Sequence, residues 1–301
     1  MKNELVKLAA VAMVAVGVVG CGGAASEGET EDGLGASKKS HVTLRRDQRR
    51  CASPGCGGYF VRDANKTTPE QYVYTIDFSA TGFDGPTSDK VLGAAANEIV
   101  LYGKLSPVDP KTNVRSFKVS SAYRGMPGRS AAAGDAFFNA TATHIQCVAA
   151  PCQDQSALKL NDTAKTSFSH YDVAAASTGF VDQVWLAARV REHGALVAAS
   201  IVDGQKMAAG SERVLAASQV FVKLPESAGP CTKAPIHLNC AKDEVIVYQR
   251  DADRCVMPSA CVKPGVCAAM VPSCDAGYSL VQWRSGPNAC NASACDPTFS
   301  L

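Results

Sequence analysis

The residues of this sequence that could do chemistry are its 13 cysteines and one cluster of arginines. Cys21 directly follows a short apolar stretch and the residues Val-Val-Gly, as does the cysteine that is acylated in bacterial lipoproteins. The other twelve are an even set that could form six disulfides or hold zinc as thiolates: Cys51, Cys56, Cys147, Cys152, Cys231, Cys240, Cys255, Cys261, Cys267, Cys274, Cys290 and Cys295. The arginine cluster is a candidate patch for an anionic partner, or a solvated face partly neutralised by Asp47: Arg45, Arg46, Arg49 and Arg50.

The first 40 residues are expected to be a signal peptide and a tether. The apolar run at residues 8–19 is too short to span a bilayer, which takes about 20 residues, and lysines precede it, as in a signal peptide. We interpret residues 1–20 as a lipoprotein signal peptide, with an ordinary secretory signal as the alternative. Residues 21–40 are Gly, Ala, Ser and acidic residues typical of a flexible tether. Because Gly22 rather than aspartate follows Cys21, we expect an outer-membrane lipoprotein on the periplasmic or cell-surface face.

If the protein is exported, its cysteines are more suited to disulfides than to a zinc site. Thiols pair outside the cytosol, so we expect six disulfides. They should stay inside repeated units, with Cys51 joined to Cys56, Cys147 joined to Cys152, and two bridges in each C-terminal module. A zinc site formed by these first four cysteines is the alternative, because Cys-x4-Cys is a possible ligand spacing.

Residues 41–225 contain two copies of one unit. Cys51, Cys56 and Asn65 recur as Cys147, Cys152 and Asn161, each 96 positions later. We place the first copy at residues 41–127 and the second at residues 128–225. The fold class expected is α+β, with an internally duplicated strand-helix-strand domain.

Local patterns suggest the elements of each copy. Residues 71–78 favour a strand, and residues 99–102 and 195–202 are apolar runs after the expected helices. The first helix is expected at residues 89–96 with Ser88 as its N-cap. The second should end before Gly194 and carry one apolar stripe: Phe180, Val181, Val184, Trp185 and Ala188. An alternating strand closes each copy, with Phe117 to Tyr123 in the first and Leu215 to Phe221 in the second.

A resemblance to a known family rests on the first cysteine pair and its surroundings. The stretches concerned are Arg45-Arg46-Asp47-Gln48-Arg49-Arg50-Cys51, Pro54-x-Cys56-Gly57-Gly58-Tyr59-Phe60-Val61, Ala150-Pro151-Cys152 and Leu160-Asn161. They resemble an uncharacterised domain that recurs in predicted lipoproteins of myxobacteria and their relatives. The resemblance covers roughly residues 41–225, and it implies no catalytic residue because that family has no known activity.

Two modules of four cysteines each follow, at residues 231–261 and 267–295, displaced by 34 to 36 positions. Each is expected to be a small β-hairpin stapled by disulfides, because about thirty residues bury too little core to fold unaided. The spacing is loosely similar to antistasin-type repeats of protease inhibitors, from which Cys255-x5-Cys261 departs.

Catalytic motifs are not apparent in this sequence. There is no nucleophile elbow, phosphate-binding loop or Cys-x-x-Cys pair, and the five histidines are scattered: His41, His144, His170, His193 and His237. We therefore expect no enzyme, no metal and no cofactor. Without residues 1–20 the chain has 28 basic and 27 acidic side chains, a balance that gives no general attraction to nucleic acid.

The function expected is that of an exported, lipid-anchored cell-envelope protein that binds an unknown envelope protein or polymer without catalysis. One alternative is a protease inhibitor that acts through a disulfide-held loop at residues 233–238. The other is an enzyme with an unrecognised site, because catalytic groups can come from distant parts of a sequence.

Overall fold

The computed structural model describes residues 38–192, 194–208, 210–225, 231, 237–268 and 270–300. The predicted signal peptide and Cys21 lie outside these residues, and so do His193 and residues 233–236 of the predicted inhibitory loop. Within the described part of the chain, no helix is long and apolar enough to cross a membrane.

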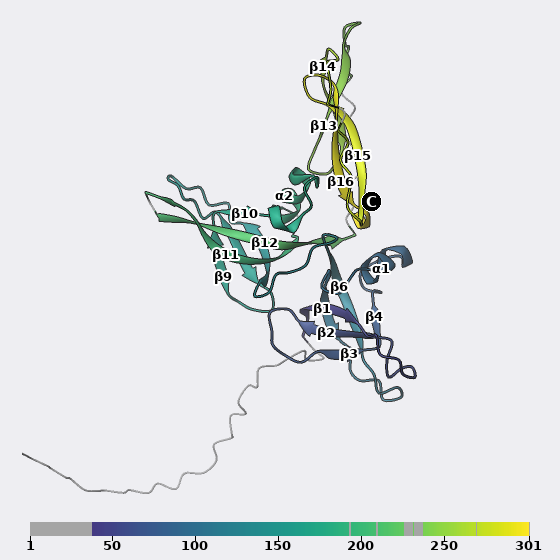
Figure 1. Ribbon diagram of the computed structural model, residues 1–301. Coiled ribbons are helices and arrows are strands. Elements are labelled where there is room, and N and C mark those ends of the chain that lie inside the picture. The colour runs from purple at the N-terminus through teal and green to yellow at the C-terminus, as the bar shows by residue number, and fades with distance from the viewer. Residues whose placement is uncertain are drawn as a thin grey trace, which may run out of the picture. The chain divides into compact units, whose positions relative to one another are not determined.

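The first copy contains six strands and one helix (Figure 1). The strands are β1 (Ser40–Arg46), β2 (Tyr59–Asp63), β3 (Gln71–Val73), β4 (Thr75–Asp77), β5 (Ile99–Leu105) and β6 (Ser116–Gly125), and helix α1 (Gly85–Leu92) precedes β5. In β6, Phe117 and Val119 are buried while Lys118 between them is exposed. Phe117 and Val119 thus share the core face, as predicted, but a bulge before Ser121 puts Ala122, and not the predicted Tyr123, in their hydrophobic cluster.

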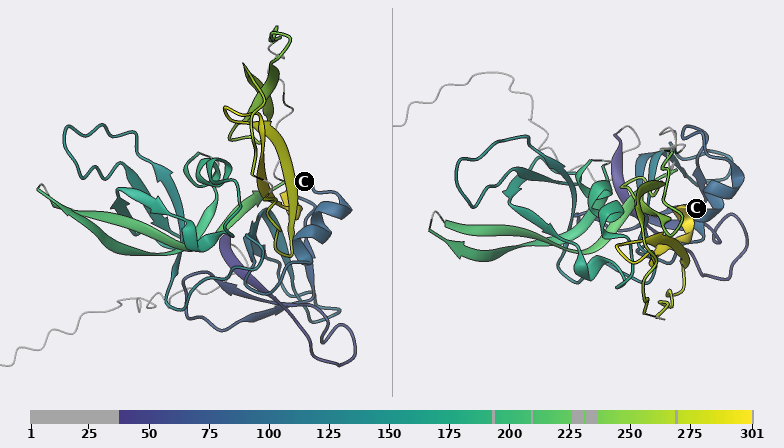
Figure 2. Two further views of the ribbon diagram at one scale, coloured as in Figure 1. Left: turned by 45° about the horizontal axis from the view of Figure 1, so that its top comes forward. Right: turned by 90° about the horizontal axis from the view of Figure 1, so that it is seen from above.

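The second copy repeats the same order of strands, with one additional turn of 3-10 helix. Its strands are β7 (Ala136–Ala142), β8 (Gln155–Lys159), β9 (Lys165–Phe168), β10 (His170–Asp172), β11 (Leu196–Met207) and β12 (Gly210–Leu224), and its helices are η1 (Ala174–Ala176) and α2 (Gln183–Arg191). The β11–β12 hairpin extends beyond its neighbours (Figure 2), since β7 pairs with only its first four residues, Leu196 to Ala199.

Both copies share one twelve-stranded sheet whose two halves are related by an approximate twofold axis. The order β3-β2-β1-β5-β6 is followed by β12-β11-β7-β8-β9, which is the same order reversed. At the centre, Tyr123 pairs with Lys223 and Gly125 with Phe221. Because Phe221 and Lys223 are the equivalents of Tyr123 and Gly125, this pairing is self-complementary, as in a symmetric dimer interface.

The prediction of an α+β fold is wrong, because the described part of the chain is mostly β-sheet and its two α-helices have only 8 and 9 residues. Only part of the predicted apolar stripe faces the core. Val181 and Trp185 are buried, but Phe180 is 50% and Val184 60% exposed. The apolar runs that follow each helix form strands, β5 and β11, as expected.

Helix α1 also begins earlier than the predicted range of residues 89–96. Asp84 rather than Ser88 is its N-cap and accepts a hydrogen bond from the Thr87 N–H at 2.8 Å. Pro86 lies in the first turn, where its missing N–H costs nothing. The helix ends at Leu92, next to Gly93.

Two equivalent asparagines join the copies reciprocally. The Asn65 side chain donates to the carbonyls of Phe137 and Leu160 and accepts from the Phe137 N–H at 2.7 Å. The Asn161 side chain bonds the equivalent backbone of the first copy, at His41 and Ala64. Both asparagines have positive φ angles, 64° and 57°, which asparagine tolerates better than most residues. The repeated Asn-x-Thr sequence thus adds a second connection between the copies, beside the pairing of β6 with β12.

The C-terminal modules form two hairpins, β13 (Val245–Arg250) with β14 (Val256–Val262) and β15 (Tyr278–Ser285) with β16 (Cys290–Pro297), followed by η2 (Thr298–Ser300). In each module the first cysteine pairs with the third and the second with the fourth: Cys231–Cys255, Cys240–Cys261, Cys267–Cys290 and Cys274–Cys295. The first two predicted bridges, Cys51–Cys56 and Cys147–Cys152, are also present, so the structure contains six disulfides.

The second module also belongs to the main core. Tyr278, Cys295 and Phe299 are buried in the same hydrophobic cluster as the sheet of the duplicated unit. The Tyr278 hydroxyl donates to the Pro127 carbonyl at 3.2 Å, and the Cys295 N–H donates to the Phe180 carbonyl at 2.8 Å. Disulfides are therefore not the only interactions that hold this module.

A buried cluster of charges lies between the modules and α2. Arg250 forms ion pairs with Asp296 of the second hairpin and with Asp182, the N-cap of α2, whose nearest carboxylate oxygen is 3.3 Å away. The Arg250 and Asp296 side chains are only 4% and 3% exposed. Arg254 lies 3.8 Å from the Asp296 carboxylate. The cluster therefore joins three segments that are distant in the sequence.

Candidate functional site

The structure divides the arginine cluster between two faces of the sheet. Arg45 and Arg46 are neighbours in β1, so their side chains point to opposite faces. Arg46 lies on the side of the buried Leu44 and lines a cavity of ≈ 260 Å³ beside the end of α1. Arg50 is exposed and forms no hydrogen bond or ion pair with the described residues. The structure thus brings together only Arg45 and Arg49.

Arg45 and Arg49 lie against two aromatic rings on the outer face of β1, β2 and β3. Arg45 is opposite Phe60 in the strand register, and Phe60 is opposite Tyr72. The two rings meet edge to face with centroids 5.7 Å apart. The Arg45 guanidinium lies 4.4 Å from the Phe60 centroid, and that of Arg49 lies 5.1 Å from Phe60 and 5.3 Å from Tyr72. We call these four residues the arginine–aromatic row.

Two carboxylates orient the guanidinium groups of the row. Glu70 accepts from Nε and Nη2 of Arg45, and Asp47 accepts from Nε and Nη2 of Arg49 at 2.9–3.1 Å. These hydrogen bonds from Arg45 and Arg49 lower the pKa values of Glu70 and Asp47, so both carboxylates stay ionised near neutral pH. Among the described residues, the Nη1 group of each arginine has no partner. Each guanidinium therefore keeps an edge that can donate to an incoming anion.

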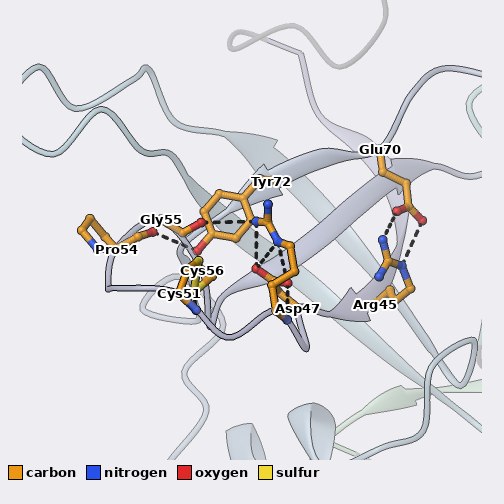
Figure 3. A network of polar contacts seen from close by, with 9 residues as sticks. Arg45, Asp47, Cys51, Pro54, Gly55, Cys56, Glu70 and Tyr72 are labelled. Carbon is orange, nitrogen blue, oxygen red and sulfur yellow. Dashed lines mark hydrogen bonds and ion pairs between the residues drawn. A yellow bond between two sulfur atoms is a disulfide. The ribbon is translucent and has the colours of Figure 1, made fainter.

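A disulfide-closed loop lies beside the Tyr72 ring (Figure 3) and contacts Arg49. Cys51 and Cys56 close the loop, and the Tyr72 hydroxyl donates to the Pro54 carbonyl at 3.0 Å. Arg49 Nη2 also donates to the carbonyl of Gly55 at 3.3 Å. The first cysteine pair therefore holds the row in place as well as closing a loop.

The second copy provides an internal comparison, because it has the same strands in the same register without the row. The register Arg45–Phe60–Tyr72 corresponds to Thr141–Ser156–Ser167. Arg49 corresponds to Ile145, which is 58% exposed. Since the same strand arrangement forms with small polar residues, neither the sheet nor the loop disulfide requires arginines and aromatic rings at these positions.

The remaining predicted site residues do not gather at the row. All twelve cysteines outside the signal region are in disulfides, and the described residues contain no cluster of His, Cys, Asp or Glu suited to a metal ion. His41 lies between the copies, and burial lowers its pKa to about 4. His170 pairs with Glu212 at 2.7 Å on the protruding hairpin. Sequence reasoning missed Phe60, Tyr72 and Glu70, although the alternation of residues in β2 and β3 was a signal for the two aromatic residues.

Comparison with known proteins places the duplicated unit in a family. An uncharacterized protein of Dictyostelium discoideum is 26% identical over 260 residues, which cover 83% of this chain and 84% of that protein. No solved structure matches the chain. A family model described as a domain of unknown function, DUF6748, matches residues 40–227, which include both copies. Because that match covers more than half of the sequence, the chain belongs to the DUF6748 family.

Proposed function

We propose that this chain is an exported, lipid-anchored envelope protein that binds an acidic polysaccharide through the arginine–aromatic row. The observation that carries the proposal is the absence of the row from the second copy. A feature that the fold does not need, and that places two cations against two half-buried aromatic rings, is best explained by a ligand. Its geometry favours binding over catalysis, since the Tyr72 hydroxyl is held by the Pro54 carbonyl and both neighbouring carboxylates are paired with arginines.

The chemistry of the row favours a sugar acid. Hydrogen bonds from arginine to a carboxylate are charge-assisted and strong, and the Nη1 groups of Arg45 and Arg49, which have no partner among the described residues, can donate to one. Aromatic rings offer apolar contact to the C–H faces of a sugar, which a bare anion cannot use. The chain has a formal net charge of only +2, so attraction must be local to the row rather than general.

The proposed location rests on the cysteines. Six disulfides are compatible with a compartment outside the cytosol. Acylation at Cys21 would then hold the chain at the outer membrane. Cells grown with radioactive palmitate are expected to label the wild-type chain and not the Cys21→Ser variant, and equal labelling of both would contradict the anchor.

The ligand class is tested by titrating the purified full chain, in mild detergent, with three polymers. We expect binding to polygalacturonate, weaker binding to polyphosphate, and none to the uncharged polymer dextran. The affinity for polygalacturonate should fall as salt is raised, since exposed charges are screened within about 8 Å at physiological ionic strength. Polyphosphate binding as tightly as polygalacturonate, or dextran binding at all, would contradict a site for sugar acids.

A further inference from the structure

The arginine–aromatic row continues into a cavity of ≈ 400 Å³ where the two copies meet. Thr43 and Arg62 form the next cross-strand pair, two residues along each strand from Arg45 and Phe60, so they lie on the same face. Both of them line the cavity, together with residues from both copies: Asp63, Ala64, Asn65, Lys66, Thr67, Asp135 and Phe137. A chain-like ligand on the row can therefore reach the cavity along this face. Asp63, the last residue of β2, follows Arg62, so its side chain leaves the strand on the opposite side and lines the cavity at the strand end.

Asp63 is the unusual group of this cavity. The residue is only 6% exposed, and its Oδ1 atom is buried without any hydrogen-bond partner. A buried acceptor left unpaired costs about 1–3 kcal/mol, and more when it is charged. Such a group in a native protein calls for an explanation. A ligand hydroxyl that donates to Asp63 would provide one.

The other groups of the cavity define what kind of ligand fits. The side chains of Arg62 and Lys66 form no hydrogen bond or close ion pair with the described residues, although their charges act on Glu70 and Asp162. All hydrogen-bonding groups of the Asn65 side chain are used between the copies, and Asp135 accepts from the Ser218 hydroxyl at 2.5 Å. Two cations thus face two carboxylates, so the cavity carries no net charge. A neutral group with several hydroxyls can both donate to the acids and accept from the bases.

The equivalent residues of the second copy differ from the charged residues that line this cavity. By the strand register, Arg62 and Asp63 correspond to Leu158 and Lys159, and Lys66 corresponds to Asp162. The charges at two of the three positions are reversed, and the third is apolar. The fold therefore does not require the polar set around Asp63.

We propose that this cavity binds an uncharged sugar unit of the same polysaccharide, next to a sugar acid held on the arginine–aromatic row. This inference rests on the proposed function. It narrows the ligand to a polymer in which uncharged and acidic units alternate, with a hydroxyl of the uncharged unit donating to Asp63.

The test uses Asp63→Asn, which removes the charge and keeps the shape, and two hexasaccharides. One is a hyaluronan hexamer, in which uncharged and uronate units alternate, and the other is a galacturonate hexamer, in which every unit is acidic. The full chain is expected to bind the alternating hexamer more tightly. Asp63→Asn should weaken binding of that hexamer about tenfold and leave binding of the galacturonate hexamer unchanged.

Stability gives the second readout. Asp63→Asn is expected to raise the midpoint of thermal unfolding, since it removes an unpaired buried charge, whereas a residue with a structural role would lower it. Asp203→Asn, which removes one exposed negative charge from β11, is the control. It should change neither the midpoint of thermal unfolding nor the affinity for the alternating hexamer. A lower midpoint in Asp63→Asn, or an unchanged preference for the alternating hexamer, would overturn the cavity site alone. If the wild-type chain binds neither hexamer, the proposed function falls with it.

Discussion

Replacing Asp296 by alanine is expected to lower the free energy of unfolding by about 3–5 kcal/mol, because it removes one partner of a buried ion pair. The Asp296 carboxylate contacts both Arg250 and Arg254, whose side chains are 4% and 6% exposed. Without it, Arg250 keeps its ion pair with Asp182, but both buried guanidinium groups lose the carboxylate that they share. The loss should appear in denaturant unfolding as a lower midpoint.

Asp243→Ala is the matched control in the neighbouring hairpin. Asp243 pairs with Lys263 at 2.7 Å, but the two side chains are 63% and 72% exposed. Exposed pairs contribute at most about 1 kcal/mol, so this variant should unfold almost as the wild-type chain does. Equal losses in the Asp296 and Asp243 variants would contradict a buried charge cluster that holds the modules against α2.

Asn65→Ala and Asn161→Ala are each expected to cost about 4 kcal/mol of unfolding free energy. About 3 kcal/mol comes from three hydrogen bonds between the copies, and roughly 1 kcal/mol from placing alanine at a positive φ. The approximate twofold axis requires the two losses to be similar. The losses need not add in the double variant, because both side chains lie at the same junction.

Asn113→Ala separates the lost hydrogen bonds from backbone strain. Asn113 also has a positive φ, 55°, but it is exposed and its side chain forms no bond with the other described residues. Its variant should show only the cost of placing alanine in the left-handed region, roughly 1 kcal/mol. If Asn65→Ala or Asn161→Ala costs no more than this control, the asparagines do not join the copies.

The sequence predicted the repeats better than the fold. Cysteines and asparagines recur because each fills a local role, as the Cys51–Cys56 loop and the Asn65 turn show. The pairing of β6 with β12, by contrast, joins segments about 100 residues apart and leaves no local pattern in either strand. The α+β prediction failed for the same reason, since it gave a short helix per copy the same weight as strands whose partners lie in the other copy.

The candidate site was predicted only in part. Arginines in adjacent positions suggested one patch, but strand alternation places Arg46 on the other face from Arg45. Phe60 and Tyr72 become part of the row through cross-strand register, which depends on how β1, β2 and β3 align. The cavity at Asp63 needs both copies in place, so no single stretch of sequence could indicate it.

The central claim is that the row of the first copy binds an acidic polysaccharide, and one exchange between the copies tests it directly. The variant carries the residues of the second copy at the four positions: Arg45→Thr, Arg49→Ile, Phe60→Ser and Tyr72→Ser. Because the second copy has the same strand arrangement with these residues, the variant should keep its circular dichroism spectrum. Arg50→Gln, which removes one exposed charge outside the row, is the control and should bind as the wild-type chain does.

The measurement is the affinity of the exchanged chain for polygalacturonate. The loss of two charge-assisted contacts should weaken binding about 100-fold relative to both the wild-type chain and Arg50→Gln. A folded variant that binds polygalacturonate within about twofold of the wild-type chain, well inside the tenfold that 1.4 kcal/mol represents, would show that the row is not the binding site.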